Sequence, residues 1–136
     1  MEIFEIPRKL KVTWDPKVKA IIITWLSYII SDEEFKTAVL TKGLNYAKTN
    51  NANAWIVDAS KARGLFKQSQ IDIIDNEIFP AFAKNGIKYF ITIKPETSIF
   101  TEQTVKKFSA LTGPHGLKLI ETANINQAIM WLRNQQ

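Results

Sequence analysis

The stretch AWIVDASKARGLFKQSQ, residues 54–70, gathers the side chains of this sequence that could do chemistry. An apolar run ends in Asp58, Ser60 follows two residues later, and a second serine, Ser69, stands near the end. Two lysines and an arginine lie between the serines. Carboxylate, hydroxyl and cationic groups at this spacing could form a phosphate-dependent switch, a catalytic site or the polar end of a buried strand.

Each of these side chains has a structural and a functional interpretation. Asp58 could bind a partner or small ligand, or it could accept backbone N–H groups of the following turn. Lys61, Arg63 and Lys67 could hold a phosphate, but without a glycine-rich phosphate loop a solvated loop is the better interpretation. Ser69 is expected to cap the next helix. Phosphorylation is its alternative, because a helix start near basic residues tolerates a phosphate.

Catalysis and metal binding find little support in the residue types. His115 is the only histidine, it lies in the turn sequence TGPHG, and no second ligand stands at metal-binding spacing. Ser60, His115 and Asp58 could be assembled into a catalytic triad, but the sequence lacks a GxSxG nucleophile elbow. There is no cysteine, hence no thiolate chemistry. We therefore expect no enzyme, no catalytic residue, no metal and no cofactor.

Composition favours one globular domain over residues 1–136, since 46% of the residues are hydrophobic and 23% are charged. A net charge of +5 permits an acidic partner, but without a recognised motif or dense basic run we do not expect nucleic acid binding. The beginning of the chain lacks the apolar core of a secretory signal, and its longest apolar stretch, AIIITWL, is too short to cross a membrane. A cytoplasmic location is expected.

The apolar patterns predict alternating strands and helices that would position these side chains. Five strands are expected, with a hairpin turn at DPKV, over residues 9–15, 18–29, 54–59, 87–95 and 116–123. One helix should begin at Ser31, which can form a capping box with Glu34, and run to about Asn50. A second should follow Ser69 and be kinked or stopped by Pro80. The others are expected over residues 101–113 and from Asn124.

This order predicts an α/β fold, with a mainly parallel sheet of about five strands, an antiparallel edge hairpin and about four helices. The runs AWIVDA and IKYFITI are the least polar strands and should occupy the centre of the sheet. Ligands and partners of such sheets gather at the carboxyl ends of the strands. Asp58 and the loop after it should therefore lie on the functional face.

The order of elements, the SDEEF helix start after an apolar TW strand, the WIVDAS strand end and the AIMWL terminal helix resemble the STAS superfamily. The resemblance is to the SpoIIAA-like (STAS/SEC14-like) bacterial proteins and spans roughly residues 14–132. In the anti-sigma-factor antagonists of that superfamily, a strand ending in aspartate and serine precedes a phosphorylatable serine at the next helix start. Asp58 and Ser60 match that strand end, and Ser69 lies near the switch serine. The aspartate before that serine is replaced by Gln68.

The resemblance implies a non-enzymatic regulatory or protein-interaction module, with small-molecule or lipid binding as the alternative. Ile71, Ile74, Ile78 and Phe82 have helical spacing and should pack on the sheet. Ile73, Phe66 and Leu65 are expected to form an exposed apolar patch that suits a protein partner or a homodimer, whereas a cavity binder would turn these side chains inward. The partner-binding candidates are therefore Asp58, Ser60, Lys61, Arg63, Phe66, Ser69 and Ile73.

Overall fold

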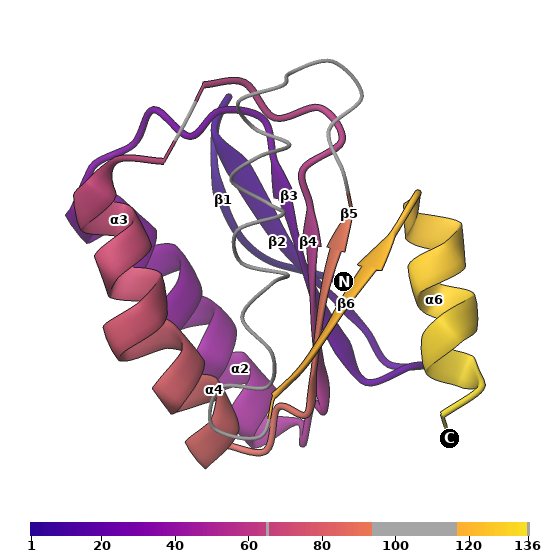
Figure 1. Cartoon of the computed structure of the whole chain (residues 1–136). Helices are drawn as coiled ribbons and strands as arrows, with labels where there is room; N and C mark the ends of the chain where they lie inside the picture. The colour runs from indigo at the N-terminus through magenta and orange to yellow at the C-terminus, as the bar shows by residue number, and fades with distance from the viewer. Residues whose placement is uncertain (65, 94–116, 136) are drawn as a thin grey trace.

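Six strands form one mixed sheet whose spatial order follows the chain in the computed structural model, which describes residues 1–64, 66–93 and 117–135 (Figure 1). The first three strands are antiparallel neighbours, and the last three run parallel to the third. Their bounds are β1 Glu2–Ile6, β2 Leu10–Asp15, β3 Ala20–Trp25, β4 Ala54–Asp58, β5 Tyr89–Ile93 and β6 Lys118–Thr122.

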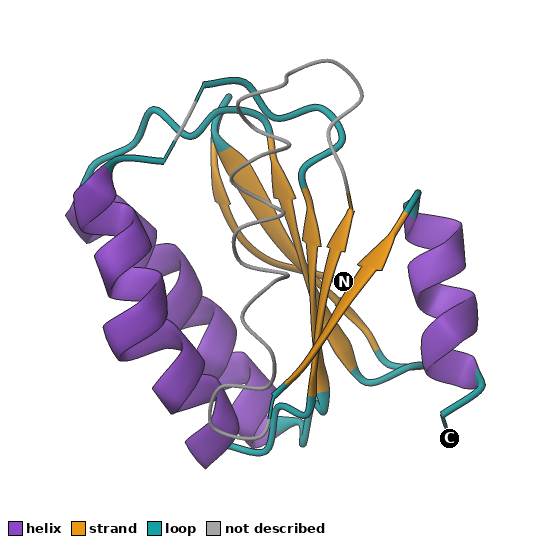
Figure 2. Ribbon diagram, in the orientation of Figure 1, coloured by secondary structure: helices purple, strands orange, loops and turns teal. Residues whose placement is uncertain are grey.

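In the described part of the chain, two continuous helical runs cover one face of the sheet, and a shorter helix covers the other (Figure 2). Each long run contains a π-helical turn between two α-helical segments. The first run consists of α1 Asp32–Lys36, η1 Thr37–Gly43 and α2 Leu44–Thr49. The second consists of α3 Gln68–Ile73, η2 Ile74–Ile78 and α4 Phe79–Lys84, and the shorter helix is α6 Ile125–Arg133. The predicted helix over residues 101–113 and His115 lie outside the described residues.

The sheet separates two hydrophobic clusters, because alternate side chains of each strand point to opposite faces. Trp25 and Trp55 are fully buried in the larger cluster, which lies under the two long helical runs. Ile56 and Ile91 belong to the smaller cluster, in which Leu132 of α6 packs on the sheet. The positions at the carboxyl ends of β3 and β4 are thus anchored by buried apolar residues on both faces.

Several predictions that depend on local sequence are confirmed. β4 and β5 both lie inside the sheet, with a paired strand on each side. The hydroxyl of Ser31 accepts from the backbone N–H of Glu34, and the Glu34 carboxylate accepts from the N–H of Ser31, so the capping box is complete. Asn124 caps α6 by accepting from the N–H of Gln127.

The structure differs from the predicted elements at three points. β1 is a sixth strand that the sequence reading missed, and its edge position leaves it half-exposed. The second predicted strand ends at Trp25 instead of Ile29, since the chain there leaves the sheet and pairs with neighbouring loops. Pro80 does not stop its helix, which continues to Lys84. The widened π turn over Ile74–Ile78 ends two residues before Pro80, within the turn that loses this backbone donor.

The first helical run lies close to the sheet at Gly43. A side-chain Cβ atom added there would overlap the ring of Trp55, whose indole is buried against the sheet. Only a residue without a side chain allows this approach.

Replacing Gly43 with alanine should therefore destabilise the fold. We expect Gly43→Ala to lower the free energy of unfolding by about 1–3 kcal/mol through overpacking, although alanine is the better helix former. Urea unfolding measures the change. Thr41→Ala, an exposed change in the same π turn, is the control and should stay within about 0.5 kcal/mol of wild type. A Gly43→Ala protein as stable as the control would contradict the close approach.

Candidate functional site at the carboxyl ends of the strands

Three loops meet where β3 and β4 end, toward the top of Figure 1. They are the turn 7–9 between β1 and β2, the loop 26–30 after β3 and the loop 59–64 after β4. Backbone hydrogen bonds join them. The N–H of Leu26 donates to the carbonyl of Lys9 at 2.7 Å, the N–H of Arg63 donates to the carbonyl of Leu26 at 3.1 Å, and the N–H of Tyr28 donates to the carbonyl of Arg63 at 2.9 Å. We call the surface of these loops the strand-end face.

A shallow hollow of about 740 Å³ lies on the strand-end face. Two large apolar side chains in it are open to solvent: Ile29 is 67% exposed and Leu26 is 41% exposed. The residues that line this outer hollow are Arg8, Leu26, Ser27, Ile29, Ser60, Lys61, Ala62 and Arg63. Three of the seven sequence-predicted candidates, Ser60, Lys61 and Arg63, are thus brought together.

The outer hollow is electrostatically one-sided. Arg8, Lys61 and Arg63 are exposed, and no acidic residue stands among the described residues that line it. Within the described ranges the ion pairs are Lys11 with Glu2 and Lys36 with Glu77, so none involves these three cations. As far as the described residues go, the hollow therefore presents positive charge without an ion-pair partner, beside apolar surface.

Asp58 stabilises the turn at the start of the loop 59–64. Its Oδ1 atom accepts from the backbone N–H of Ser60 at 3.1 Å and from the Ser60 hydroxyl at 2.7 Å. This is the turn-acceptor interpretation that the sequence favoured. Asp58 fixes the position of Ser60 at the rim of the outer hollow, and it does not itself line the hollow.

Ser69 does not cap its helix, which corrects the sequence prediction. The second helical run begins two residues earlier, with Lys67 at the cap position, because the Gln70 side chain accepts from the backbone N–H of Lys67 at 3.0 Å. The exposed Ser69 hydroxyl donates to a carboxylate oxygen of Asp32 at 3.1 Å and so links the starts of the two helical runs. A phosphate on Ser69 would lie beside this carboxylate.

The expected exposed patch does not form, since Ile73 and Phe66 both turn toward the core. Ile73 is only 7% exposed, because the second helical run contacts α1 as well as the sheet and buries a wider sector than one stripe. Phe66 packs its ring 4.1 Å from that of Tyr28, with Trp25 and Phe35 also in contact. Leu65 lies outside the described residues.

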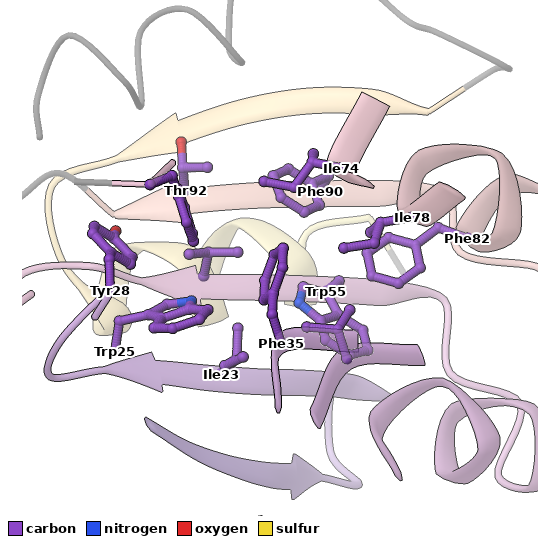
Figure 3. Close-up of a pocket in the computed structure, with 13 residues that line it drawn as sticks. Ile23, Trp25, Tyr28, Phe35, Trp55, Ile74, Ile78, Phe82, Phe90 and Thr92 are labelled. Carbon is purple, nitrogen blue, oxygen red and sulfur yellow. The ribbon is translucent and has the colours of Figure 1, made fainter. Parts of the chain in front are cut away.

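The inward-turned aromatic rings border a second, inner cavity of about 50 Å³ (Figure 3). Its lining is almost entirely apolar: Ile23, Trp25, Tyr28, Phe35, Val39, Trp55, Val57, Phe66, Ile74, Ile78, Phe82, Phe90 and Thr92. Tyr28 connects the two sites, because its ring borders the inner cavity while the next residue, Ile29, borders the outer hollow. Burial raises the pKa of the Tyr28 hydroxyl, and the charge of Asp58 raises it further.

Gln70 fixes the loop that separates the two sites. It is fully buried, and its Nε2 atom donates to the carbonyl of Ile30 at 2.9 Å. Sequence reasoning missed this residue, although its spacing from Ile74 and Ile78 places a polar side chain in the apolar stripe of the helix. Leu26 and Ile29 were missed because they were assigned to a strand, and Arg8 because β1 was not recognised.

No family model, curated protein or solved structure matches the chain. The resemblance to the STAS superfamily therefore stays a prediction. In the described ranges, no three acidic, histidine or cysteine side chains gather as a metal site would require. None of the helices in that part of the chain has the length and apolar character needed to span a membrane.

Removing the Gln70 side chain should loosen the strand-end face. We expect Gln70→Ala to cost about 2 kcal/mol of unfolding free energy, because it leaves the Ile30 carbonyl and the Lys67 N–H without their partner. Chemical denaturation measures this loss. Gln68→Ala, which removes only an exposed hydrogen bond to Asp72, is the matched control and should cost less than about 0.5 kcal/mol. Equal stability of the two variants would contradict the role of Gln70.

Tyr28 should make the protein less stable at alkaline pH. Its pKa is raised in the folded state, so above about pH 10 the unfolded chain loses a proton that the folded protein retains, and stability falls. This one group steepens the fall by up to about 1.4 kcal/mol per pH unit. Tyr28→Phe has no hydroxyl to ionise, so it lacks this contribution to the pH dependence of stability. Urea midpoints between about pH 8 and 11 should therefore fall less steeply for the variant. Parallel profiles would contradict a buried, protonated Tyr28.

Proposed function

We propose that this chain is a non-enzymatic binding module that captures a protein partner on its strand-end face. The observation that carries the proposal is the outer hollow, in which the exposed side chains of Leu26 and Ile29 lie beside three cations that form no ion pair within the described ranges. Exposed apolar surface is unfavourable in water and is covered on association, while the neighbouring cations favour a partner of opposite charge. The loop after Asp58, which is the contact surface expected from the sequence, supplies half of the residues that line the hollow.

The strand-end face is held in position before a partner arrives. The isolated bridge between Ser27 and Arg63 joins the two long loops, and the Asp58 carboxylate fixes the turn at Ser60. Gln70 fastens the end of the first loop to the second helical run. Because these contacts already order the loops, binding needs to immobilise little more than side chains, which favours affinity.

A regulatory role of the kind found in anti-sigma-factor antagonists is part of the proposal. It is supported by the match of Asp58 and Ser60 to their strand end, and by the position of Ser69 near the helix start. A phosphate on Ser69 would repel Asp32, with which the hydroxyl now bonds, and would separate the starts of α1 and α3. A phosphosite at Ser69 would thus act through the contact between the helices, at the side of the strand-end face.

The second candidate function is binding of a small apolar ligand in the inner cavity. It is favoured by the almost wholly apolar lining and by Phe66 turning inward, which is the arrangement expected of a cavity binder. A volume of about 50 Å³ is far below that of a usual ligand pocket, about 300–1,000 Å³. Anything larger than a few atoms must displace Phe66 or a neighbouring ring.

Loss of the exposed apolar side chains should weaken partner capture. We expect Leu26→Ser combined with Ile29→Ser to weaken capture from native lysate, or self-association in sedimentation, by at least about tenfold, since the two changes remove the apolar surface that a partner would cover. Both residues are exposed, so the unfolding midpoint should change little. The control is Met130→Ser, which alters a similarly exposed side chain on α6, the helix on the sheet face away from the two long helical runs. Undiminished capture by the double variant would refute the proposal.

Filling the inner cavity separates the second candidate from the first. Val57→Ile adds one methyl group to the lining and should raise the unfolding free energy by up to about 1 kcal/mol. Val12→Ile, in the same cluster but away from the cavity, is the control and should not stabilise. An apolar compound that is extracted from the wild-type protein and missing from Val57→Ile would favour cavity binding. Unchanged partner capture by the filled variant is what the first candidate expects.

A further inference from the structure

We infer that the partner of the outer hollow is an acidic, amphipathic segment of a protein, whose carboxylates meet Arg8, Lys61 and Arg63 and whose apolar side chains cover Leu26 and Ile29. This inference rests on the proposed function and names the chemistry of the partner. It follows from the charge, the apolar content and the shape of the hollow.

The charge of the hollow selects an anionic partner. Arg8 comes from the β1–β2 turn, and Lys61 and Arg63 come from the loop after β4, so the cations approach the hollow from two sides. The carboxylate of Asp58 is engaged by the N–H and hydroxyl of Ser60 and does not line the hollow. An ion pair that forms at an open surface keeps part of its hydration, and unlike charges steer the encounter.

The exposed apolar side chains of the hollow favour a partner that carries apolar groups as well as negative charge. Ile29 lines the hollow together with the cations and is 67% exposed. Its side chain lies near Gly64, where an added Cβ atom would stand 3.5 Å from its Cγ1 atom. Gly64 has a φ of +85°, a conformation that favours glycine. A purely anionic ligand such as phosphate would leave this side chain in water.

The shape favours a peptide segment over a lipid surface. The site is concave, and its volume of about 740 Å³ lies in the range of pockets that take several side chains. Membrane-binding surfaces use interfacial aromatic residues or clusters of about four to eight basic residues. The described lining contains three basic residues and no aromatic one.

The test is a titration of the ¹⁵N-labelled protein with defined probes, followed by the amide signals of residues 26–29 and 61–64. The probes are a twelve-residue peptide of leucine and glutamate at helical spacing, the same peptide with lysine for glutamate, and phosphatidylcholine vesicles with phosphatidylserine. We expect the glutamate peptide alone to shift these signals. Its affinity should fall at least about fivefold when salt rises from about 50 to 500 mM, because the charges are screened.

Charge reversal assigns that binding to the hollow. Arg8→Glu, Lys61→Glu and Arg63→Glu together should weaken the glutamate peptide by more than about tenfold. The control combines Lys17→Glu, Lys48→Glu and Lys84→Glu, exposed residues near the amino ends of the parallel strands, and makes the same change in net charge. It should keep most of the affinity. If the first triple variant fails to fold, Lys61→Glu alone should act in the same direction, by about threefold.

The outcomes separate the inference from the proposed function. No shift with the glutamate peptide, equal shifts with the lysine peptide, equal loss in both triple variants, or binding to vesicles alone would each overturn the acidic segment. The capture experiment with Leu26→Ser and Ile29→Ser would still support a partner on this face. If that double variant captures its partner normally, the proposed function itself fails, whatever the peptides do.

Discussion

Gln70 donates from its amide to the carbonyl of Ile30 and accepts, through its carbonyl oxygen, from the N–H of Lys67. It does this with no exposure to solvent, where a polar group without partners costs free energy. The two bonds therefore tie the end of the loop after β3 to the start of the second helical run. The loop between β4 and that run ends at Lys67, so it is held at the same place. The strand-end face depends on this geometry.

Successive side chains of the loop 26–30 lie in two different environments. Tyr28 points into the aromatic cluster and packs on Phe66 and Trp25. Ile29 points out, with its backbone N–H bound to the hydroxyl of Ser27 at 3.1 Å. Since close-packed rings resist displacement, the cluster gives the outer face a rigid underside. The exposed apolar side chains thus belong to an ordered surface and are not the product of a loose loop.

The sequence predicted the features that depend on residues close together in the chain. These are the Ser31 capping box, the Asn124 cap and the interior positions of β4 and β5, which follow from neighbouring residues and from apolar runs. The wrong predictions concern residues whose positions depend on contacts with distant parts of the sequence. Ile73 is buried because α1 lies beside its helix, and the start of that helix is set by a buried Gln70 instead of by Ser69. Three of the seven site candidates share the outer hollow, because they follow one strand end that the sequence located correctly.

The inner cavity and the outer face share one residue, Tyr28. The ring of Tyr28 borders the cavity, while its backbone N–H donates to the carbonyl of Arg63 on the outer face. A guest larger than about 50 Å³ would have to displace Tyr28, Phe66 or another ring of the lining. If Tyr28 moves, the bridge between the two long loops is strained, and Leu26, Ile29 and the cations beside them change position. Because coupling of this kind is reciprocal, a partner that holds the outer face in its present form would also oppose the entry of such a guest.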